Sequence, residues 1–239
     1  IRSGYNATLF LDSAGDVWST GANTTGINLG TARTAPVKMG GIDNVVILQA
    51  HLETSYCAAF AIQTDGDMYA LGYNVVGSLG VGDATQRSAW TQSGGSLNFC
   101  HVVCVGSGTN RSSVALAGVP GDLFDTTGKT VYVCGENNYG QLGQGNNTDS
   151  TSWIQPSATS YGTSYLKTVT SADGSINSSS NMAFPRTSVV DIYDASMQEA
   201  AGLICYTDNQ ARFWYTGNWY RMYGFANHTA TEVVNLPYM

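Results

Sequence analysis

Hydrophobic and polar residues alternate along this 239-residue chain in short runs that are typical of β-strands. No long stretch keeps its apolar side chains on one helical face, because Gly or clusters of Ser and Thr interrupt almost every candidate. The best short helix candidate is residues 194–201, which fit a turn in a loop equally well. The pattern therefore predicts an all-β fold.

Four segments of the chain repeat the same order of strand, tight turn and strand. The second segment has a small and apolar strand at 57–62, a turn at 63–67 and a returning strand at 68–72. The Asp-Gly pair in this turn supplies the positive φ of a hairpin turn, and the apolar first strand fits burial on both faces. The other segments are 7–21, 113–135 with a longer insertion, and 202–217. Each segment is predicted to be a β-hairpin.

Each hairpin ends in a glycine, which lets the chain leave the sheet where a side chain would not fit. These glycines are Gly21, Gly72, Gly135 and Gly217. A second shared element follows, because residues 72–83 align without a gap with residues 135–146. Each of these Gly-rich loops contains one leucine, Leu79 or Leu142, which we expect to anchor its loop in the core.

A known repeat family shares these features. Residues 134–143 read Cys-Gly-Glu-Asn-Asn-Tyr-Gly-Gln-Leu-Gly, which resembles the signature of the regulator of chromosome condensation repeat family. Residues 99–106 resemble the strand that precedes the next blade in that family. The resemblance covers about the whole chain, is strongest in the second and third segments, and implies a β-propeller.

The resemblance implies one β-propeller-like domain over residues 1–239. Its repeat units are about 1–50, 51–105, 106–165 and 189–239, with an insertion near 162–188. Four units are visible, whereas the family's ring typically has about seven blades, within the range of propellers. The ring is therefore either completed by further residues or is a short or open version of the fold.

Composition excludes several classes of partner. The chain has 10 Lys and Arg against 17 Asp and Glu, and a net charge of -7. Nucleic-acid binding needs clustered cations, so we expect no nucleic-acid partner. No apolar run is long enough for a membrane span, so we expect no membrane insertion.

Cysteine and histidine give no strong metal or nucleophile signal. The five cysteines are irregularly spaced, which favours buried thiols over a disulfide framework. Cys100, His101 and Cys104 have zinc-like side chains, but a second ligand pair is missing nearby. His51 and His228 stand alone without a nucleophile motif. We expect no metal and no cofactor.

Two carboxylate pairs suggest general acid and base chemistry, but each fits a hairpin turn better. They are Asp65 with Asp67 and Asp122 with Asp125. A glycosidase needs two carboxylates across a sugar ring, whereas Asp in a turn bonds to the backbone. The Gly-rich loops lack the Lys and the following helix of a phosphate site. We therefore expect no catalytic residues and no enzyme activity.

The densest aromatic cluster is the strongest candidate for binding. Seven aromatic residues lie between Phe213 and Phe225, and two arginines lie beside them. Trp, Tyr and Arg are enriched at binding hot spots, and strand alternation places about half of them outward. The expected outward set is Arg212, Trp214, Trp219 and Arg221.

Charged residues are only 11% of the chain, and Ser, Thr, Asn and Gly are abundant. This composition favours a non-enzymatic interaction module on a virion surface, in a phage tail, fibre or capsid decoration, that serves assembly or host attachment. We expect a virion or extracellular location, protein partners or self-assembly, and a host-surface glycan or receptor as a further partner. The alternative is a free or secreted propeller of the same family that binds or inhibits a protein. A third hypothesis, a carbohydrate-active enzyme, would use the aspartates named above.

Overall fold

The computed structural model describes part of the chain. The described residues are 1–22, 32–53, 55–118, 129–138, 142–144, 146–156, 166–170, 176–177, 187–193, 204–207 and 212–216, with backbone alone at 105–107 and beyond 156. Across these segments, no helix has the length and apolarity needed to cross a membrane.

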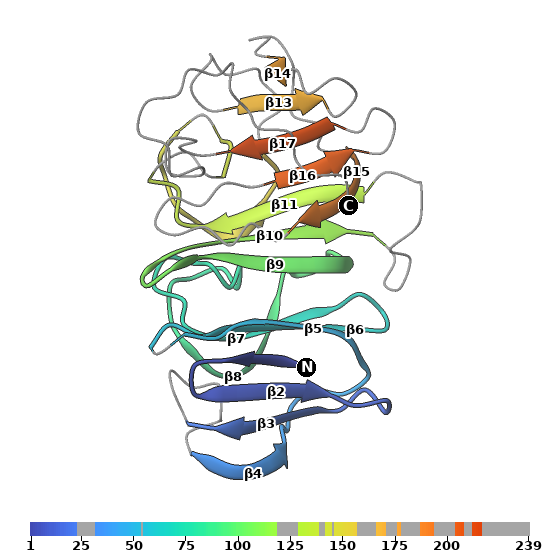
Figure 1. Cartoon of the computed structure of the whole chain (residues 1–239), viewed down its shortest axis with the longest axis vertical. Coiled ribbons are helices and arrows are strands. Elements are labelled where there is room, and N and C mark those ends of the chain that lie inside the picture. Colours follow the sequence, from blue (N-terminus) through green and yellow to red (C-terminus); the bar gives the residue numbers. More distant parts are fainter. Residues whose placement is uncertain are drawn as a thin grey trace.

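The strands form several antiparallel sheets, so the predicted all-β class is confirmed (Figure 1). The first sheet contains β1 (Arg2–Gly4), β2 (Ala7–Leu11), β3 (Val17–Gly21) and β4 (Arg33–Lys38) in that order. The second contains β5 (Val45–His51), β6 (Ala58–Gln63), β7 (Met68–Gly72) and β8 (Arg87–Ser93). The third contains β9 (Phe99–Ser107), β10 (Asn110–Ala117), β11 (Lys129–Gly135) and β12 (Ser150–Ile154).

The remaining strands continue from the third sheet. They are β13 (Leu166–Thr170), β14 (Ile176–Asn177), β15 (Thr187–Tyr193), β16 (Ile204–Thr207) and β17 (Arg212–Thr216). One half of β11 pairs with β12 and the other half pairs with β15. β16 and β17 pair antiparallel, as the fourth predicted hairpin requires. β13 lies within the expected insertion and pairs with β17.

The first strands of the three sheets lie near one another. β5 contacts β1 and β2 of the preceding sheet, and β9 contacts β5 and β6 in the same way. Each of the second and third sheets therefore stacks on the previous one through its first strand. The inner strands are tied to the preceding hairpin turn, because Val45 N donates to Gly15 O at 3.0 Å and Phe99 N donates to Gly66 O at 2.8 Å.

The first two predicted hairpins are confirmed in the geometry of their turns. Gly15 and Gly66 occupy the turns with φ of 83° and 94°, conformations that L side chains rarely adopt. The closing glycine Gly72 has φ of 112°, and a Cβ there would lie 2.2 Å from Cys57 O. The strand therefore ends where the backbone of its neighbour leaves no room for a side chain.

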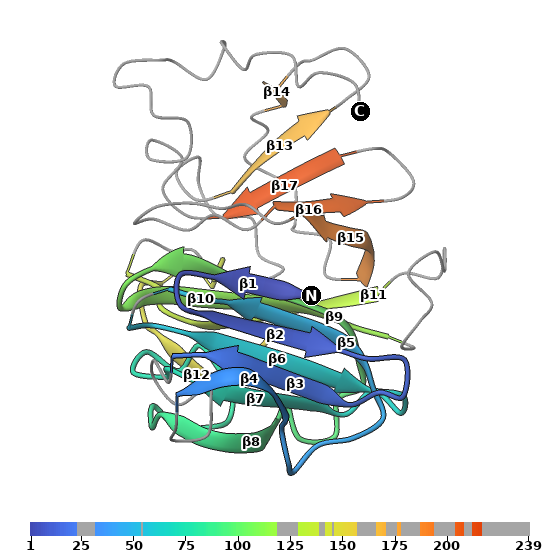
Figure 2. The same ribbon diagram turned by 60° about the horizontal axis from the view of Figure 1, so that its bottom comes forward.

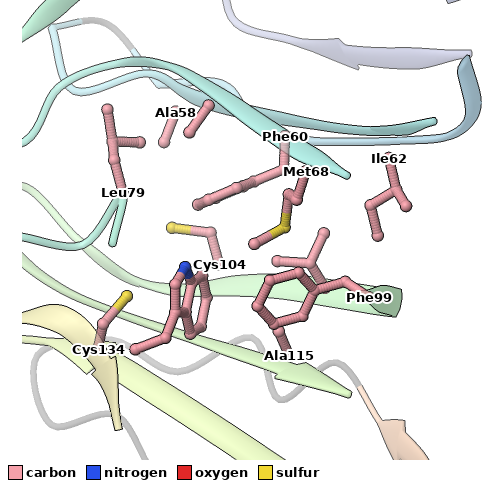
Figure 3. Close-up of a cluster of buried hydrophobic side chains, with 12 residues drawn as sticks. Ala58, Phe60, Ile62, Met68, Leu79, Phe99, Cys104, Ala115 and Cys134 are labelled. Atoms are coloured by element: carbon pink, nitrogen blue, oxygen red, sulfur yellow. The ribbon is translucent and has the colours of Figure 1, made fainter. Parts of the chain in front are cut away.

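Two hydrophobic clusters fill the spaces between the sheets. The second sheet contributes to both, because alternate residues of β6 face opposite neighbours. Ala59 and Ala61 pack toward the first sheet, whereas Phe60 and Ile62 pack toward the third, beside Phe99 (Figure 3). β6 is thus buried on both faces, as its apolar sequence predicts.

The outer face of the first sheet differs from the matching faces of the next two sheets. Counted back from the closing glycines, Trp18 matches Tyr69 of the second sheet, and Phe10 matches the buried Ala61. Ala61 is covered by the preceding sheet, whereas Phe10 and Trp18 are half-buried. The first sheet therefore presents an aromatic pair at positions that are interfaces elsewhere in the fold.

Candidate functional site

One end of the stacked sheets carries a contiguous set of loops, which we call the loop face. Successive strands are antiparallel, so connections from first to second and from third to fourth strands emerge at this end (Figure 2). Its described parts are residues 5–6, 52–53, 55–57, 73–86, 108–109 and the described residues of 136–149. The opposite end carries residues 12–16, 39–44, 64–67 and 94–98, which we call the turn face.

Two long loops on the loop face are held by the same side-chain bonds. Asn74 Oδ1 accepts from Leu79 N at 2.8 Å, and Asn137 Oδ1 accepts from Leu142 N at 2.8 Å. Both asparagines and both leucines are completely buried. The prediction that Leu79 and Leu142 anchor these loops in the core is confirmed.

Aromatic and apolar side chains lie on this end of the molecule. Tyr5 is 73% exposed in the turn between β1 and β2, and Val75 is 49% exposed in the loop after β7. Tyr56 packs edge-on against the buried Tyr73, with ring centroids 4.9 Å apart. Exposed aromatic and apolar side chains therefore lie beside polar groups on this face, a combination that is typical of protein-binding surfaces.

A charged cluster joins the second and third sheets on the loop face. Glu53, in the loop after β5, reaches the turn between β9 and β10. Its Oε2 accepts from Gly108 N at 3.1 Å and from Arg111 Nη2 at 2.9 Å. Its Oε1 lies 3.1 Å from His51 Nε2. One carboxylate therefore bonds to both sheets at their junction.

Arg111 is the buried member of this cluster. Its side chain has no exposed surface, whereas that of Glu53 is 31% exposed. Arg111 Nε donates to Gly108 O at 3.0 Å, while Nη1 is buried without a hydrogen-bond partner among the described residues. A buried guanidinium is costly without a counterion, so Arg111 depends on Glu53.

The surroundings of the cluster shift two pKa values. Burial raises the pKa of Glu53, but the bonds from His51 and Gly108 and the charge of Arg111 outweigh burial and hold it below the usual 4.5. Burial and the neighbouring Tyr56 raise the pKa of Tyr73 above 10.0. Glu53 is therefore ionised and Tyr73 neutral near pH 7.

Sequence reasoning missed Glu53 and Arg111 and set His51 aside as an isolated residue. Glu53 and Arg111 are 58 positions apart, and no local motif contains both. The only available signal was the internal repeat, because Arg111 occupies the position that Cys57 holds in the second sheet. An arginine at a position buried in the neighbouring repeat indicates a buried charge.

The turn face is acidic, and its carboxylates serve the turns. Asp65 Oδ1 accepts from Asp67 N at 3.0 Å, the structural role that the sequence favoured over catalysis. Bonds from the backbone of Asp16 and the side chain of Trp18 lower the pKa of Asp12. Asp122 and Asp125 lie outside the described residues.

Cys57, Cys100, Cys104 and Cys134 are buried thiols, as expected. No three His, Cys, Asp or Glu side chains in the described part of the chain gather as a metal site would require. A bulge in the pairing of β9 with β10 lies beside Cys100, so strict alternation of side chains fails there. The side chain of Cys205 and all of His228 lie outside the described residues.

Half of the predicted aromatic binding set lies outside the described residues. Arg212 and Trp214 are on β17, where the backbone alone is described, and their positions on one strand share a face. Trp219 and Arg221 lie outside the described residues. This set stays a prediction.

An uncharged groove of about 370 Å³ lies at the outer junction of the second and third sheets. Gly80 and Gly82 form one side, Gly94 and Gly95 another, and Trp153 is part of the lining. Trp153 Nε1 donates to Ser93 Oγ at 2.7 Å, so the indole N–H is used inside the protein. The groove is thus lined where Trp153 of the third sheet packs beside glycines of the second sheet.

Comparison with known proteins agrees with the repeated architecture. Residues 130–164, which contain β11 and β12, match the model of the regulator of chromosome condensation (RCC1) repeat. This match supports a relationship between this chain and the RCC1 repeat family. The Danio rerio protein named "Protein RCC2 homolog" is 34% identical over 124 residues, 51% of this chain.

Two solved structures resemble the chain at low identity. The crystal structure of human WBSCR16 has a TM-score of 0.49 and 15% identity, over 87% of this chain and 61% of that one. The crystal structure of Kap60 bound to yeast RCC1 (Prp20) has a TM-score of 0.49 and 18% identity, over 90% and 41%. The chain spans 22% of the length of the RCC2 homologue.

Proposed function

We propose that the chain is a non-enzymatic protein-binding module whose partner binds the loop face. The observation that carries this proposal is the pair of loops anchored by Asn74 and Asn137, because binding residues are commonly held on loops by a rigid scaffold. The exposed Tyr5 and Val75 on this face supply contact area. The match to the RCC1 repeat supports an interaction role rather than catalysis.

The test uses a partner that co-purifies with the native protein at fixed stoichiometry. It compares the affinity of that partner for matched variants of this chain. Tyr5→Ala and Val75→Ser are expected to weaken binding about ten-fold each in calorimetric titration, since each removes contact area at the face. Val37→Ser is the control, because Val37 is similarly exposed, at 45%, on the edge strand β4. Equal affinities for all three variants would contradict the proposed face.

We further propose that this module acts in a virion or outside the cell. The support is composition, since charged residues are only 11% and neutral polar residues are abundant. Assembly or host attachment, including contact with a surface glycan, would be its task there. A free or secreted propeller that binds or inhibits one protein is the alternative. The mass of the native assembly separates these two proposals. A large particle supports the virion module, and a one-to-one complex supports the free or secreted propeller.

The half-buried aromatic side chains on the outer face of the first sheet support the proposal that a further sheet covers this face and completes a propeller. Phe10 and Trp18 occupy positions that are covered by a preceding sheet in the second and third repeats. Hydroxyl-radical footprinting of the native assembly is expected to show Trp18 protected relative to the separate 239-residue chain. Equal modification in both would favour an open array.

A further inference from the structure

We propose that Glu53 and Arg111 form a latch that holds the second and third sheets together at the loop face and opens when Glu53 loses its charge. The latch itself rests on the contacts described here. Its effect on partner binding rests on the proposed function. The two claims can fail separately, as the experiment below allows.

The first step of the argument is the position of the two residues. Glu53 belongs to the loop after β5, Gly108 belongs to the turn that leads into β10, and Arg111 is the second residue of β10 itself. The carboxylate takes both cross-sheet bonds on one oxygen, from Gly108 N and from Arg111 Nη2. Removing this one side chain therefore breaks two contacts between the sheets.

The second step is the asymmetry of burial. Arg111 is completely buried, and Glu53 is the carboxylate that the structure pairs with it. Water can reach Glu53 and protonate it, because its side chain is 31% exposed. The guanidinium cannot be neutralised in turn, so loss of the Glu53 charge leaves an unbalanced buried cation. The arrangement relaxes most easily if the loop and turn separate.

The third step is the set of titratable groups that face the pair. His51 contacts the second oxygen of Glu53, Tyr73 lies close enough to Arg111 to interact with its charge, and Tyr56 packs against Tyr73. Cys57 Sγ donates to the backbone oxygen of Glu53 at 2.9 Å, which fixes the loop but not the carboxylate. Protonation of Glu53 is thus the step by which low pH removes the counterion of the buried Arg111.

The equivalent junction between the first and second sheets has a different contact. There the end of β1 packs closely on the loop after β5, because a Cβ on Gly4 would lie 2.5 Å from Leu52 O. Close packing at Gly4 and a hydrogen bond from the half-buried Arg2 Nε to Gln49 Oε1 at 2.7 Å join the two sheets there, with no fully buried cation among the described residues of that junction. The first junction therefore serves as an internal control for the second.

The experiment follows individual backbone amides of the native protein by NMR and hydrogen exchange. In the wild type, the Gly108 amide proton is expected to shift as Glu53 titrates below pH 4.5, and Glu53→Gln is expected to abolish that titration. At pH 7, Glu53→Ala is expected to accelerate exchange at Gly108 at least ten-fold. Val45, whose amide bonds to Gly15, is expected to exchange at the wild-type rate.

Unchanged exchange at Gly108 in Glu53→Ala would overturn the latch, and so would equal acceleration at Val45, which indicates global unfolding. If Glu53→Ala does not fold, the wild-type titration and Glu53→Gln carry the test. The double variant Glu53→Gln with Arg111→Met removes the buried charge and is expected to restore slow exchange relative to Glu53→Gln alone. No restoration would contradict the role of the arginine.

A binding measurement separates the latch from the proposed function. If the loop face binds the partner, Glu53→Ala is expected to weaken binding about ten-fold through loss of the ordered loop. Faster exchange at Gly108 with unchanged affinity would retain the latch and contradict the loop face as the binding site. Unchanged exchange with weakened affinity would retain the face and overturn the latch.

Discussion

At the scale of single residues, the charge with the largest expected effect on stability is that of Arg111, which the sequence alone did not identify as buried. Arg111 lies in a strand whose neighbouring positions are apolar or small, and its guanidinium is fully buried. Its stability contribution depends on a carboxylate from another sheet. An exposed pair, such as Arg87 with Asp83, has water as an alternative partner and contributes little.

This contrast gives a paired prediction for stability. Glu53→Ala is expected to lower the free energy of unfolding by about 3 kcal/mol, since it leaves a buried cation unpaired. Asp83→Ala, which breaks an ion pair whose carboxylate is 50% exposed, is expected to cost below about 1 kcal/mol. Urea denaturation at pH 7 measures both. Similar losses in the two variants would show that the burial of Arg111 has no energetic consequence.

The same pair predicts a dependence on pH. The folded-state pKa of Glu53 lies below its ordinary value of 4.5, so its charge stabilises the fold above pH 4.5. That contribution is lost as the pH falls through the lower folded-state value. The stability difference between wild type and Glu53→Gln is therefore expected to be constant from pH 7 to about 5 and to shrink below pH 4.5. A difference that grows in acid would contradict this sign.

At the scale of elements, the closing glycines define where each hairpin ends. Gly72 combines a positive φ with a neighbouring backbone oxygen that a Cβ would approach to 2.2 Å. Gly82 also has a positive φ, of 94°, but a Cβ there meets nothing within 4 Å. The two glycines thus separate the cost of backbone conformation from the cost of a clash.

We predict that Gly82→Ala costs about 1 kcal/mol, from the positive φ alone. Gly72→Ala is expected to cost at least about 3 kcal/mol, because β7 must also move away from Cys57. Thermal unfolding of the two variants, followed by circular dichroism, measures the difference. Comparable melting temperatures would show that the sheet adapts to the added methyl group.

The hairpins could be predicted from sequence because their determinants are local. An apolar strand, an Asp-Gly turn and a closing glycine lie within about fifteen residues in the second repeat, and the structure forms β6 and β7 from them. The loop anchors Leu79 and Leu142 were predictable because the repeat placed them in register. Glu53 with Arg111 was not predictable, since only the stacking of two sheets brings them together.

At the scale of the whole molecule, the three sheets give the chain two unlike ends. Aspartates dominate the turn face, at Asp12, Asp16, Asp43, Asp65 and Asp67. Asp12 and Asp65 accept hydrogen bonds from backbone amides of their turns. The loop face combines anchored loops, exposed aromatic and apolar side chains, and the Glu53 cluster. If binding follows this division, one end should contact the partner and the other should remain in solvent.

Site-specific photo-crosslinking tests that division most directly. A benzophenone amino acid would replace Tyr56 on the loop face or Asp65 on the turn face, in the native protein with its co-purifying partner. Both residues lie in connections outside the strands, so neither substitution alters sheet pairing. The account predicts a discrete crosslinked product from position 56 and none from position 65. A product from position 65 alone would contradict the loop face as the binding surface.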